Sequence, residues 1–153
     1  MTTPLHLASR EGHTNAIRLL IEHNADVNVV NGRGLTPLHY TSWKGDIVAV
    51  QLLINTGADI NVKSKRGFNP LHQASYKGHT DTMQLLIELG ADVDEKSNDR
   101  RTPLHLASWN SHTNAIQLLI DNGADVNEKD ILGQTPLYWI ILYRQIGAVR
   151  LLC

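Results

Sequence analysis

The sequence contains only one cysteine, Cys153 at its last position, so it cannot form an internal disulfide framework. It also lacks a strong net charge, because 14 Lys and Arg residues face 15 Asp and Glu residues, for a formal net charge of −1. A near-neutral chain has no overall attraction to nucleic acid or to an anionic membrane surface. The missing disulfides fit a reducing compartment.

Long apolar segments are absent as well. The longest apolar run lies near Tyr138 to Tyr143 and is far shorter than the ~20 residues of a transmembrane helix. The opening residues, Met1 to Pro4, lack the charged and apolar regions of a secretory signal. We therefore expect a cytoplasmic or nuclear protein that is neither secreted nor inserted in a membrane.

Sequence motifs for catalysis are also missing. The chain has no Gly-x-Ser-x-Gly, no glycine-rich phosphate loop followed by Lys-Ser/Thr, and no Cys-x-x-Cys. Cys153 has no nearby histidine, and the paired carboxylates Asp92 and Asp94 fall in predicted turns. We expect no enzymatic activity and no cofactor.

The few prolines reveal the organisation of the chain. They stand at positions 4, 37, 70, 103 and 136, so each follows the last by 33 residues, which is typical of a stacked repeat array. Each proline follows Thr or Asn and precedes Leu. Thr or Asn at an N-cap accepts a free backbone N–H, and proline at the first helical position loses no hydrogen bond. Each proline therefore predicts the start of a helix.

Apolar residues at helical spacing predict two helices in each unit, joined by a short turn and followed by a loop rich in glycine. The expected helices span 4–10, 14–22, 37–44, 47–55, 70–77, 80–89, 103–110, 113–122, 136–143 and 146 to the end. No strand-like alternation is present. The expected fold is all-α.

The repeated Thr-Pro-Leu-His-Leu-Ala, Gly-His, Leu-Leu-Ile and Gly-Ala-Asp-Val-Asn elements resemble the ankyrin repeat over the whole chain. The resemblance implies an all-α solenoid of 33-residue helix-turn-helix units with projecting β-hairpin-like loops and a concave surface. It also implies a single array over residues 1–153, with repeats at 3–35, 36–68, 69–101 and 102–134 and an incomplete repeat at 135–153.

Two glycine positions of the repeat are not always occupied by glycine. Arg100 stands where the other units have Gly34, Gly67 and Gly133, and Ser111 and Arg144 stand where they have Gly12, Gly45 and Gly78. A residue other than glycine held at positive φ costs on the order of 1 kcal/mol. We expect repeats four and five to be less stable at these positions.

By resemblance, the last two residues of each first helix face the concave surface. Trp43, Tyr76 and Trp109 would then form a ladder with one ring per repeat, beside Lys44, Lys77 and Asn110. Trp and Tyr are enriched in binding hot spots, which favours a binding role. The alternative is that the rings cover the helices and pack on each other. We predict a partner-binding site that also includes the loop residues Arg33, Lys65, Arg66, Phe68 and Arg101.

Ten of the fourteen basic residues lie in or beside the loops, namely Arg33, Lys44, Lys63, Lys65, Arg66, Lys77, Lys96, Arg100, Arg101 and Lys129. Most carboxylates belong to the repeat framework. The neutral chain could therefore present a positive binding face. The alternative is a solvated rim that keeps the array soluble.

Seven of the eight histidines fall in two registers of the repeat, and His23 stands alone. Equivalent histidines on stacked repeats lie roughly 10 Å apart, about one helix diameter. A shared metal ion needs ligands at about 2.0–2.1 Å. We expect structural histidines and no metal site.

Asn28, Asn61 and Asn127 follow Ala-Asp-Val or Ala-Asp-Ile, whereas the third repeat has Asp94 at this position. The family resemblance makes these asparagines candidates for cytosolic asparaginyl hydroxylases, with Asp94 the weakest site. The alternative is that each asparagine only stabilises its loop.

The sequence thus favours a non-enzymatic protein-interaction module that binds another protein, with an acidic or polar segment, on its concave face. Binding of a nucleotide or oligonucleotide is the alternative, because Trp and Tyr can stack on bases. A third reading is a spacer in a longer array. We expect a monomer, with end-to-end stacking of chains as the alternative.

Overall fold

The computed structural model describes residues 1–147, and side chains up to residue 142. Within this part the chain forms helices and turns but no strand. The helices are α1 (Pro4–Glu11), α2 (Thr14–Glu22), α3 (Pro37–Lys44), α4 (Ile47–Asn55), α5 (Pro70–Lys77), α6 (Thr80–Glu88), α7 (Pro103–Trp109), α8 (Thr113–Asp121) and α9 (Pro136–Gly147). The predicted all-α fold is confirmed.

The first helix of each unit begins where the prolines predict. Thr3, Thr36, Asn69 and Thr102 are the N-caps of α1, α3, α5 and α7, and each forms a capping box with the histidine three residues later. Gly12, Gly45 and Gly78 end α1, α3 and α5 in the left-handed conformation. Ser111 and Arg100, which replace glycine, also have positive φ values of 56° and 59°, as predicted.

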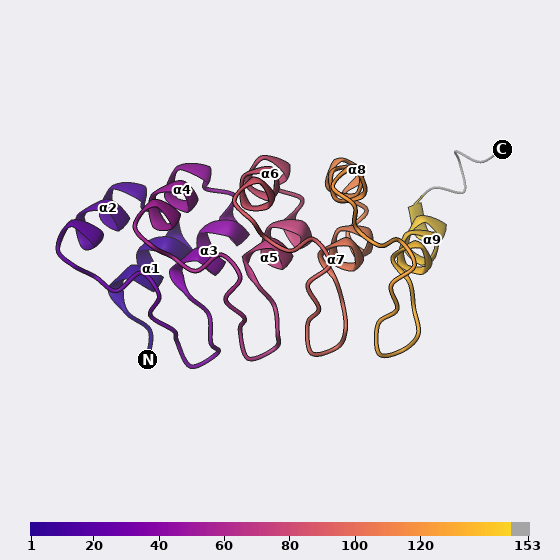
Figure 1. Cartoon of the computed structure of the whole chain (residues 1–153), viewed down its shortest axis with the longest axis horizontal. Helices are drawn as coiled ribbons and strands as arrows, with labels where there is room; N and C mark the ends of the chain where they lie inside the picture. Colours follow the sequence, from indigo (N-terminus) through magenta and orange to yellow (C-terminus); the bar gives the residue numbers. More distant parts are fainter. Residues whose placement is uncertain (148–153) are drawn as a thin grey trace.

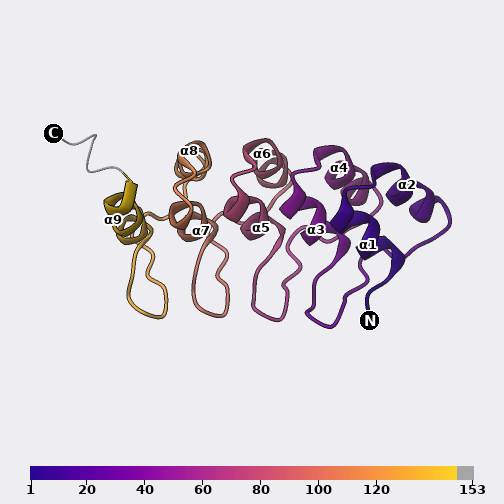
Figure 2. The same ribbon diagram turned by 180° about the vertical axis from the view of Figure 1, so that it is seen from behind.

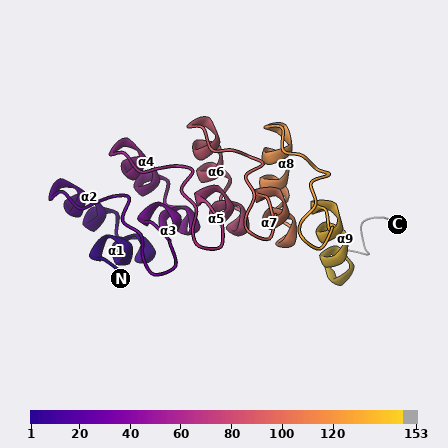
Figure 3. The same cartoon turned by 60° about the horizontal axis from the view of Figure 1, so that its bottom comes forward.

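The helix pairs stack in series into two layers (Figure 1 and, from behind, Figure 2). The first helices, α1, α3, α5, α7 and α9, contact one another in order, and so do the second helices α2, α4, α6 and α8. The layers follow a common curve with the first helices on its inner side (Figure 3). The motif leucines Leu5, Leu38, Leu71 and Leu104 are buried in the core between the layers.

Four loops, here called fingers 1–4 (residues 23–36, 56–69, 89–102 and 122–135), connect each second helix to the next first helix and project to one side of the array (Figure 1). The projecting tip of each finger is a turn, and these turns begin at Asn31, Ser64, Ser97 and Asp130. In every turn the N–H three residues later bonds to the carbonyl of this residue, as in a β-turn. These residue types favour the first position of such a turn.

Repeat five departs from the prediction. A helix break was expected after Tyr143, but α9 continues through Ile146 to Gly147, so that prediction is wrong. The physical reason is at position 144, where arginine replaces the glycine that ends α1, α3 and α5. Ser111 takes the left-handed conformation at the equivalent position after α7, whereas the arginine at 144 continues the helix. The rest of the second helix predicted here lies outside the described residues.

The predicted bounds of α2, α3, α4 and α5 are confirmed, and four other helix ends differ from the prediction by one residue. The first helix extends to Glu11 rather than Arg10, while α6, α7 and α8 end at Glu88, Trp109 and Asp121, one residue earlier than expected. Helix ends are the least determined part of any prediction from sequence. These shifts do not change the faces that the helices present.

Candidate binding groove on the concave face

A groove of about 830 Å³ runs between the first helices and the fingers. Most of the predicted partner-binding residues line it. The lining comprises Gly32, Arg33, Leu35, Trp43, Ser64, Lys65, Arg66, Phe68, Gln73, Tyr76, Arg101, Leu106 and Trp109. The lining includes four cationic side chains and no Asp or Glu, so the groove is both aromatic and positively charged.

Trp43 and Tyr76 form the aromatic centre of the groove. They occupy the same position of consecutive repeats, near the ends of α3 and α5, and their rings stack at 5.3 Å with planes 13° apart. Trp43 is 39% exposed and Tyr76 is 36% exposed. Phe68 lies beside them in the lining, tilted against the ring of His72 at 5.4 Å. The rings therefore support one another and still present area to solvent.

Three predicted site residues lie at the edge of the groove and not in its lining. The Lys77 Nζ atom lies 4.7 Å from the centroid of the Trp43 ring, a cation–π arrangement. Lys44 packs beside Gly12 of the preceding repeat, with its Cε 3.1 Å from where a Cβ atom would stand. Asn110 donates from its side-chain amide to the Tyr76 carbonyl oxygen at 3.0 Å. Asn110 thus has a structural bond between repeats.

The third ring of the predicted ladder belongs to a second stacked pair. Trp109 stacks on Trp139 of α9 with centroids 4.7 Å apart and planes 13° apart. Trp139 is only 7% exposed. The Arg101 guanidinium lies over both rings, at 5.1 Å from Trp109 and 5.4 Å from Trp139, and its Nε is 3.8 Å from Oδ2 of the buried Asp130. This end of the groove is more closely packed than the Trp43 end.

Trp139 was not predicted as part of this site. It stands 33 residues after Leu106, whereas Trp109 stands 33 residues after Tyr76. The two tryptophans therefore occupy different positions of the 33-residue repeat, and a comparison of equivalent positions does not pair them. The available signal was a large ring at the position one helical turn before the ladder, where the other repeats have Leu7, Tyr40, Gln73 and Leu106.

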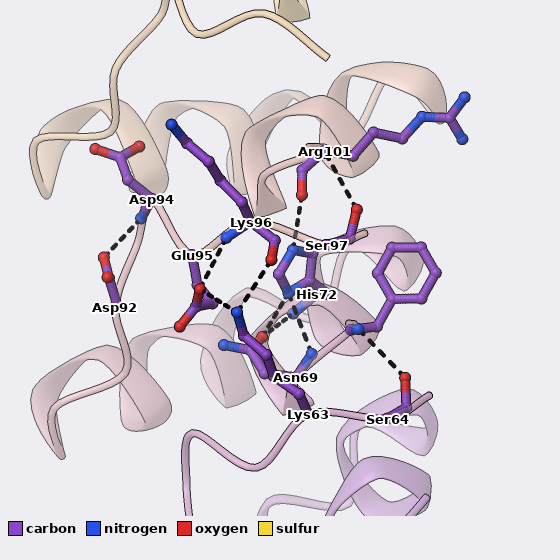
Figure 4. A network of polar contacts seen from close by, with 11 residues as sticks. Lys63, Ser64, Asn69, His72, Asp92, Asp94, Glu95, Lys96, Ser97 and Arg101 are labelled. Carbon is purple, nitrogen blue, oxygen red and sulfur yellow. Dashed lines mark hydrogen bonds and ion pairs between the residues drawn. The ribbon is translucent and has the colours of Figure 1, made fainter. Parts of the chain in front are cut away.

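The cations near the fingers fall into two groups. Lys63 pairs with Glu95 at 2.6 Å, and Glu128 pairs with Lys96 at 3.0 Å and Arg100 at 3.2 Å (Figure 4 shows the first pair). The ammonium of Lys96, which donates to the Glu128 carboxylate, holds the pKa of Glu128 below its usual value. These three cations are neutralised by the next finger.

The second group comprises Arg33, Lys65 and Arg66, which line the groove. Among the residues that the structure describes, none of the three has a carboxylate partner. Surface ion pairs contribute only ~0–1 kcal/mol to stability, so the selective pairing matters more for the charge of the surface than for the fold. The net positive charge is thus placed on the groove side of the fingers.

The motif histidines are structural. The Thr36 backbone N–H donates to His39 Nδ1 at 3.1 Å, so the proton is on Nε2, which donates to the Phe68 carbonyl at 2.9 Å. His6, His72 and His105 contact the equivalent carbonyls of Leu35, Arg101 and Gln134 (Figure 4 shows the His72 contact). Burial lowers the pKa of His39 and of His72 to about 4. Each histidine therefore ties a first helix to the following finger.

The second register of histidines also bonds to backbone. His79 Nε2 lies 2.9 Å from the Trp43 carbonyl, and His112 Nε2 lies 3.0 Å from the Tyr76 carbonyl. Within residues 1–147, no group of three or more His, Cys, Asp or Glu side chains is placed to hold a metal ion. Over the same residues, no helix is long and apolar enough to cross a bilayer.

The candidate hydroxylation sites lie on the exposed side of the loops. The Asn28 side chain donates to the Gly57 carbonyl at 2.9 Å and accepts from the Asp59 N–H at 2.8 Å. Asn61 donates to Gly90 at 3.3 Å. Asp94 accepts from the Asp125 N–H at 2.9 Å but, as a carboxylate, has no amide to donate. The side chains of Asn28, Asn61 and Asp94 thus join consecutive repeats.

A family model described as "Ankyrin repeats (3 copies)" matches residues 1–64 and 42–130 of the chain. The two matches together cover well over half of the 153 residues and include the first four Pro-Leu-His motifs. A search among curated proteins gave no match.

Proposed function

Because the chain belongs to the ankyrin-repeat family, whose repeats are generally protein–protein interaction modules, we propose that it binds a segment of another protein in the concave groove. The family is typically non-enzymatic, and we propose the same of this chain. Since a fold alone does not specify a partner, the proposal rests on the side chains of the groove.

One observation carries the proposal. Trp43 and Tyr76 stack on each other at 5.3 Å and remain 39% and 36% exposed at the centre of a groove of about 830 Å³. Exposed aromatic clusters on soluble domains are uncommon and often mark interaction sites. Since the rings already hold each other in place, a partner would lose little side-chain entropy on binding them.

A pull-down with matched variants tests this function. The chain is immobilised as wild type, as the double variant Trp43→Ala/Tyr76→Ala, and as Leu19→Ala, which removes an exposed apolar side chain from α2 outside the groove lining. We expect proteins retained by the wild type and by Leu19→Ala to be lost from the double variant. Circular dichroism confirms that each variant is folded.

Two other outcomes would contradict the proposal. Equal retention by the double variant would place the binding site elsewhere on the array. Retention of no protein by the wild type would favour the spacer interpretation.

The oligonucleotide alternative has its own test, because the stacked ring pair stands beside unpaired cations. Binding to a single strand should quench tryptophan fluorescence and weaken steeply with added salt. We expect neither effect from a mixed-sequence oligonucleotide at concentrations at which the protein partner binds.

A further inference from the structure

The finger turns place two residues at the end of each finger. We call these pairs tip 1 (Gly32 and Arg33), tip 2 (Lys65 and Arg66), tip 3 (Asn98 and Asp99) and tip 4 (Ile131 and Leu132). The tips are bonded in series, since the N–H groups of Lys65, Asn98 and Ile131 donate to the carbonyls of Arg33, Arg66 and Asp99, each at 3.0 Å. The tips therefore form one continuous edge with a fixed order of side chains.

The chemistry of the tips changes along this edge. Arg33, Lys65 and Arg66 make tips 1 and 2 cationic, and these three cations have no carboxylate partner in the described part of the chain. Lys63 of finger 2 and Lys96 of finger 3, by contrast, pair with Glu95 and Glu128 of the following fingers. Charge is thus neutralised along the fingers and left uncompensated at the first two tips.

The last two tips differ from the first two. Tip 3 is polar and acidic, with the exposed carboxylate of Asp99. Tip 4 is apolar, with Ile131 59% exposed and Leu132 66% exposed. The equivalent positions of tips 1–3 hold glycine, lysine, arginine, asparagine and aspartate, so the repeat itself does not require aliphatic residues there. Two adjacent exposed aliphatic side chains are suited to contact with another molecule.

We propose that the partner is an extended acidic peptide segment that crosses the finger tips, with its carboxylates against tips 1 and 2 and an apolar side chain against tip 4. The proposal rests on the proposed function, since the peptide continues from the tips into the groove of Trp43 and Tyr76. Charge complementarity selects the acidic end, and Asp99 repels carboxylates placed at tip 3. The edge therefore selects peptides by their composition and by the spacing of their acidic and apolar residues.

The fold sets that spacing. Neighbouring fingers are about one helix diameter apart, on the order of 10 Å, so tips 1 and 2 lie roughly 20–30 Å from tip 4. An extended chain advances about 3.3–3.6 Å per residue. The carboxylates and the apolar side chain of the partner should then be separated by about six to nine residues.

Selection of peptides tests this inference. A random library of about twelve residues displayed on phage is panned against the immobilised full chain, and peptides that also bind Trp43→Ala/Tyr76→Ala are discarded. We expect the remaining peptides to be enriched in Asp and Glu, with Leu, Ile or Phe about six to nine positions away. Affinities of a representative peptide are then measured by fluorescence anisotropy for the wild type and three variants.

The variants separate tip contacts from overall charge. Arg66→Glu at tip 2 should weaken binding about tenfold or more, whereas Arg18→Glu, the same charge change at an exposed position of α2, should change it less than about twofold. Leu132→Ser at tip 4 should weaken binding by about threefold to tenfold. Circular dichroism shows whether each variant keeps the helical content of the wild type.

The results distinguish the failure of the finger-tip contacts from the failure of the proposed groove function. Selected peptides that depend on Trp43 and Tyr76 but show no excess of acidic residues, or equal losses from Arg66→Glu and Arg18→Glu, would overturn the inference and leave the groove as the binding site. If no peptide depends on Trp43 and Tyr76, the proposed function fails as well.

Discussion

Trp109 and Trp139 stack face to face at 4.7 Å, although they occupy different positions in their repeats. The pair joins α7 to α9 and is covered by the Arg101 guanidinium. Trp43 and Tyr76 stack with the same 13° angle between planes but are 39% and 36% exposed, whereas Trp139 is only 7% exposed. Two similar ring pairs therefore have different roles, one in packing the last repeat and one at the open surface.

Alanine substitutions should separate these roles. We expect Trp109→Ala to lower the free energy of unfolding by about 3–5 kcal/mol, because it leaves a cavity against a buried ring. Trp43→Ala should cost only about 1 kcal/mol, the magnitude of an exposed aromatic pair. Urea denaturation followed by far-ultraviolet circular dichroism measures the unfolding free energy of both variants. Equal losses would contradict the assignment of one pair to packing and the other to the open surface.

The regular part of the molecule was predictable because each repeat encodes it locally. The Thr-Pro or Asn-Pro pairs determine where α3, α5 and α7 begin, and the glycine at position 45 or 78 determines where a helix ends. These effects act within a few residues and do not depend on the rest of the fold. The repeat period then orders the helices in space.

The candidate site was predictable only where it follows the repeat. Trp43 and Tyr76 meet because they are equivalent residues on stacked helices. The contact of Trp109 with Trp139 joins two residues that are not equivalent in the repeat. The pairing of Lys63 with Glu95 depends on side-chain conformation. Such contacts depend on distances of a few ångströms, which a repeat period does not determine.

Gly45 is required for a second reason besides its φ of +76°. A Cβ atom there would lie 2.7 Å from the ring of His79. Ser111 occupies the equivalent position of the fourth repeat and has a φ of 56°. We expect Gly45→Ala to cost about 2–5 kcal/mol of unfolding free energy, from strain at positive φ and from the clash.

Gly57 provides the control for this prediction. Its φ is +98° but no atom lies within 4 Å of its Cβ position, so Gly57→Ala should cost only about 1 kcal/mol. His79→Ala in the Gly45→Ala background should recover the part of the loss that is due to the clash. The prediction is wrong if the two alanine variants are equally stable.

The buried histidines predict loss of stability in acid. The pKa of His39 is about 4 in the folded chain, against an ordinary value of 6.5, because burial disfavours the charged ring. The unfolded state therefore binds more protons between these values, and stability falls as the pH falls from 6.5 towards 4. From pH 7.5 to pH 5 the loss should be about 2 kcal/mol for His39, and His72 shifts in the same direction.

Urea titrations at pH 7.5 and pH 5 measure this loss. His39→Gln should be less stable than the wild type at pH 7.5, because the bond to the Phe68 carbonyl is weakened, but should lose about 2 kcal/mol less on going to pH 5. An unchanged pH dependence in His39→Gln would contradict the assignment.

Asparagine hydroxylation remains a prediction about Asn28, Asn61 and Asn127. Incubation with a cytosolic asparaginyl hydroxylase, followed by peptide mass spectrometry, should show the mass of one added oxygen on these residues and less on Asp94. Asn28 is bonded on both sides of its amide, to Gly57 and Asp59, so it must detach locally before it can enter an enzyme. Gly57→Ala, which strains this loop at positive φ, should therefore increase the modification of Asn28. Absence of the oxidised species on every asparagine would end the hypothesis.

Ser9, Ser42, Ser75 and Ser108 occupy one buried position of successive first helices, and their hydroxyl oxygens have no hydrogen-bond partner within the described residues. A buried polar group without a partner costs ~1–3 kcal/mol. We therefore expect Ser75→Ala to leave stability unchanged or to raise it by about 1 kcal/mol. Ser97→Ala is the matched control, because the buried Ser97 hydroxyl accepts from the Arg101 N–H at 3.1 Å and should lower stability by about 1 kcal/mol when removed. The same chemical change should thus have opposite signs at two buried serines, and a clear loss in Ser75→Ala, measured by urea denaturation, would show that its hydroxyl has a partner in solution.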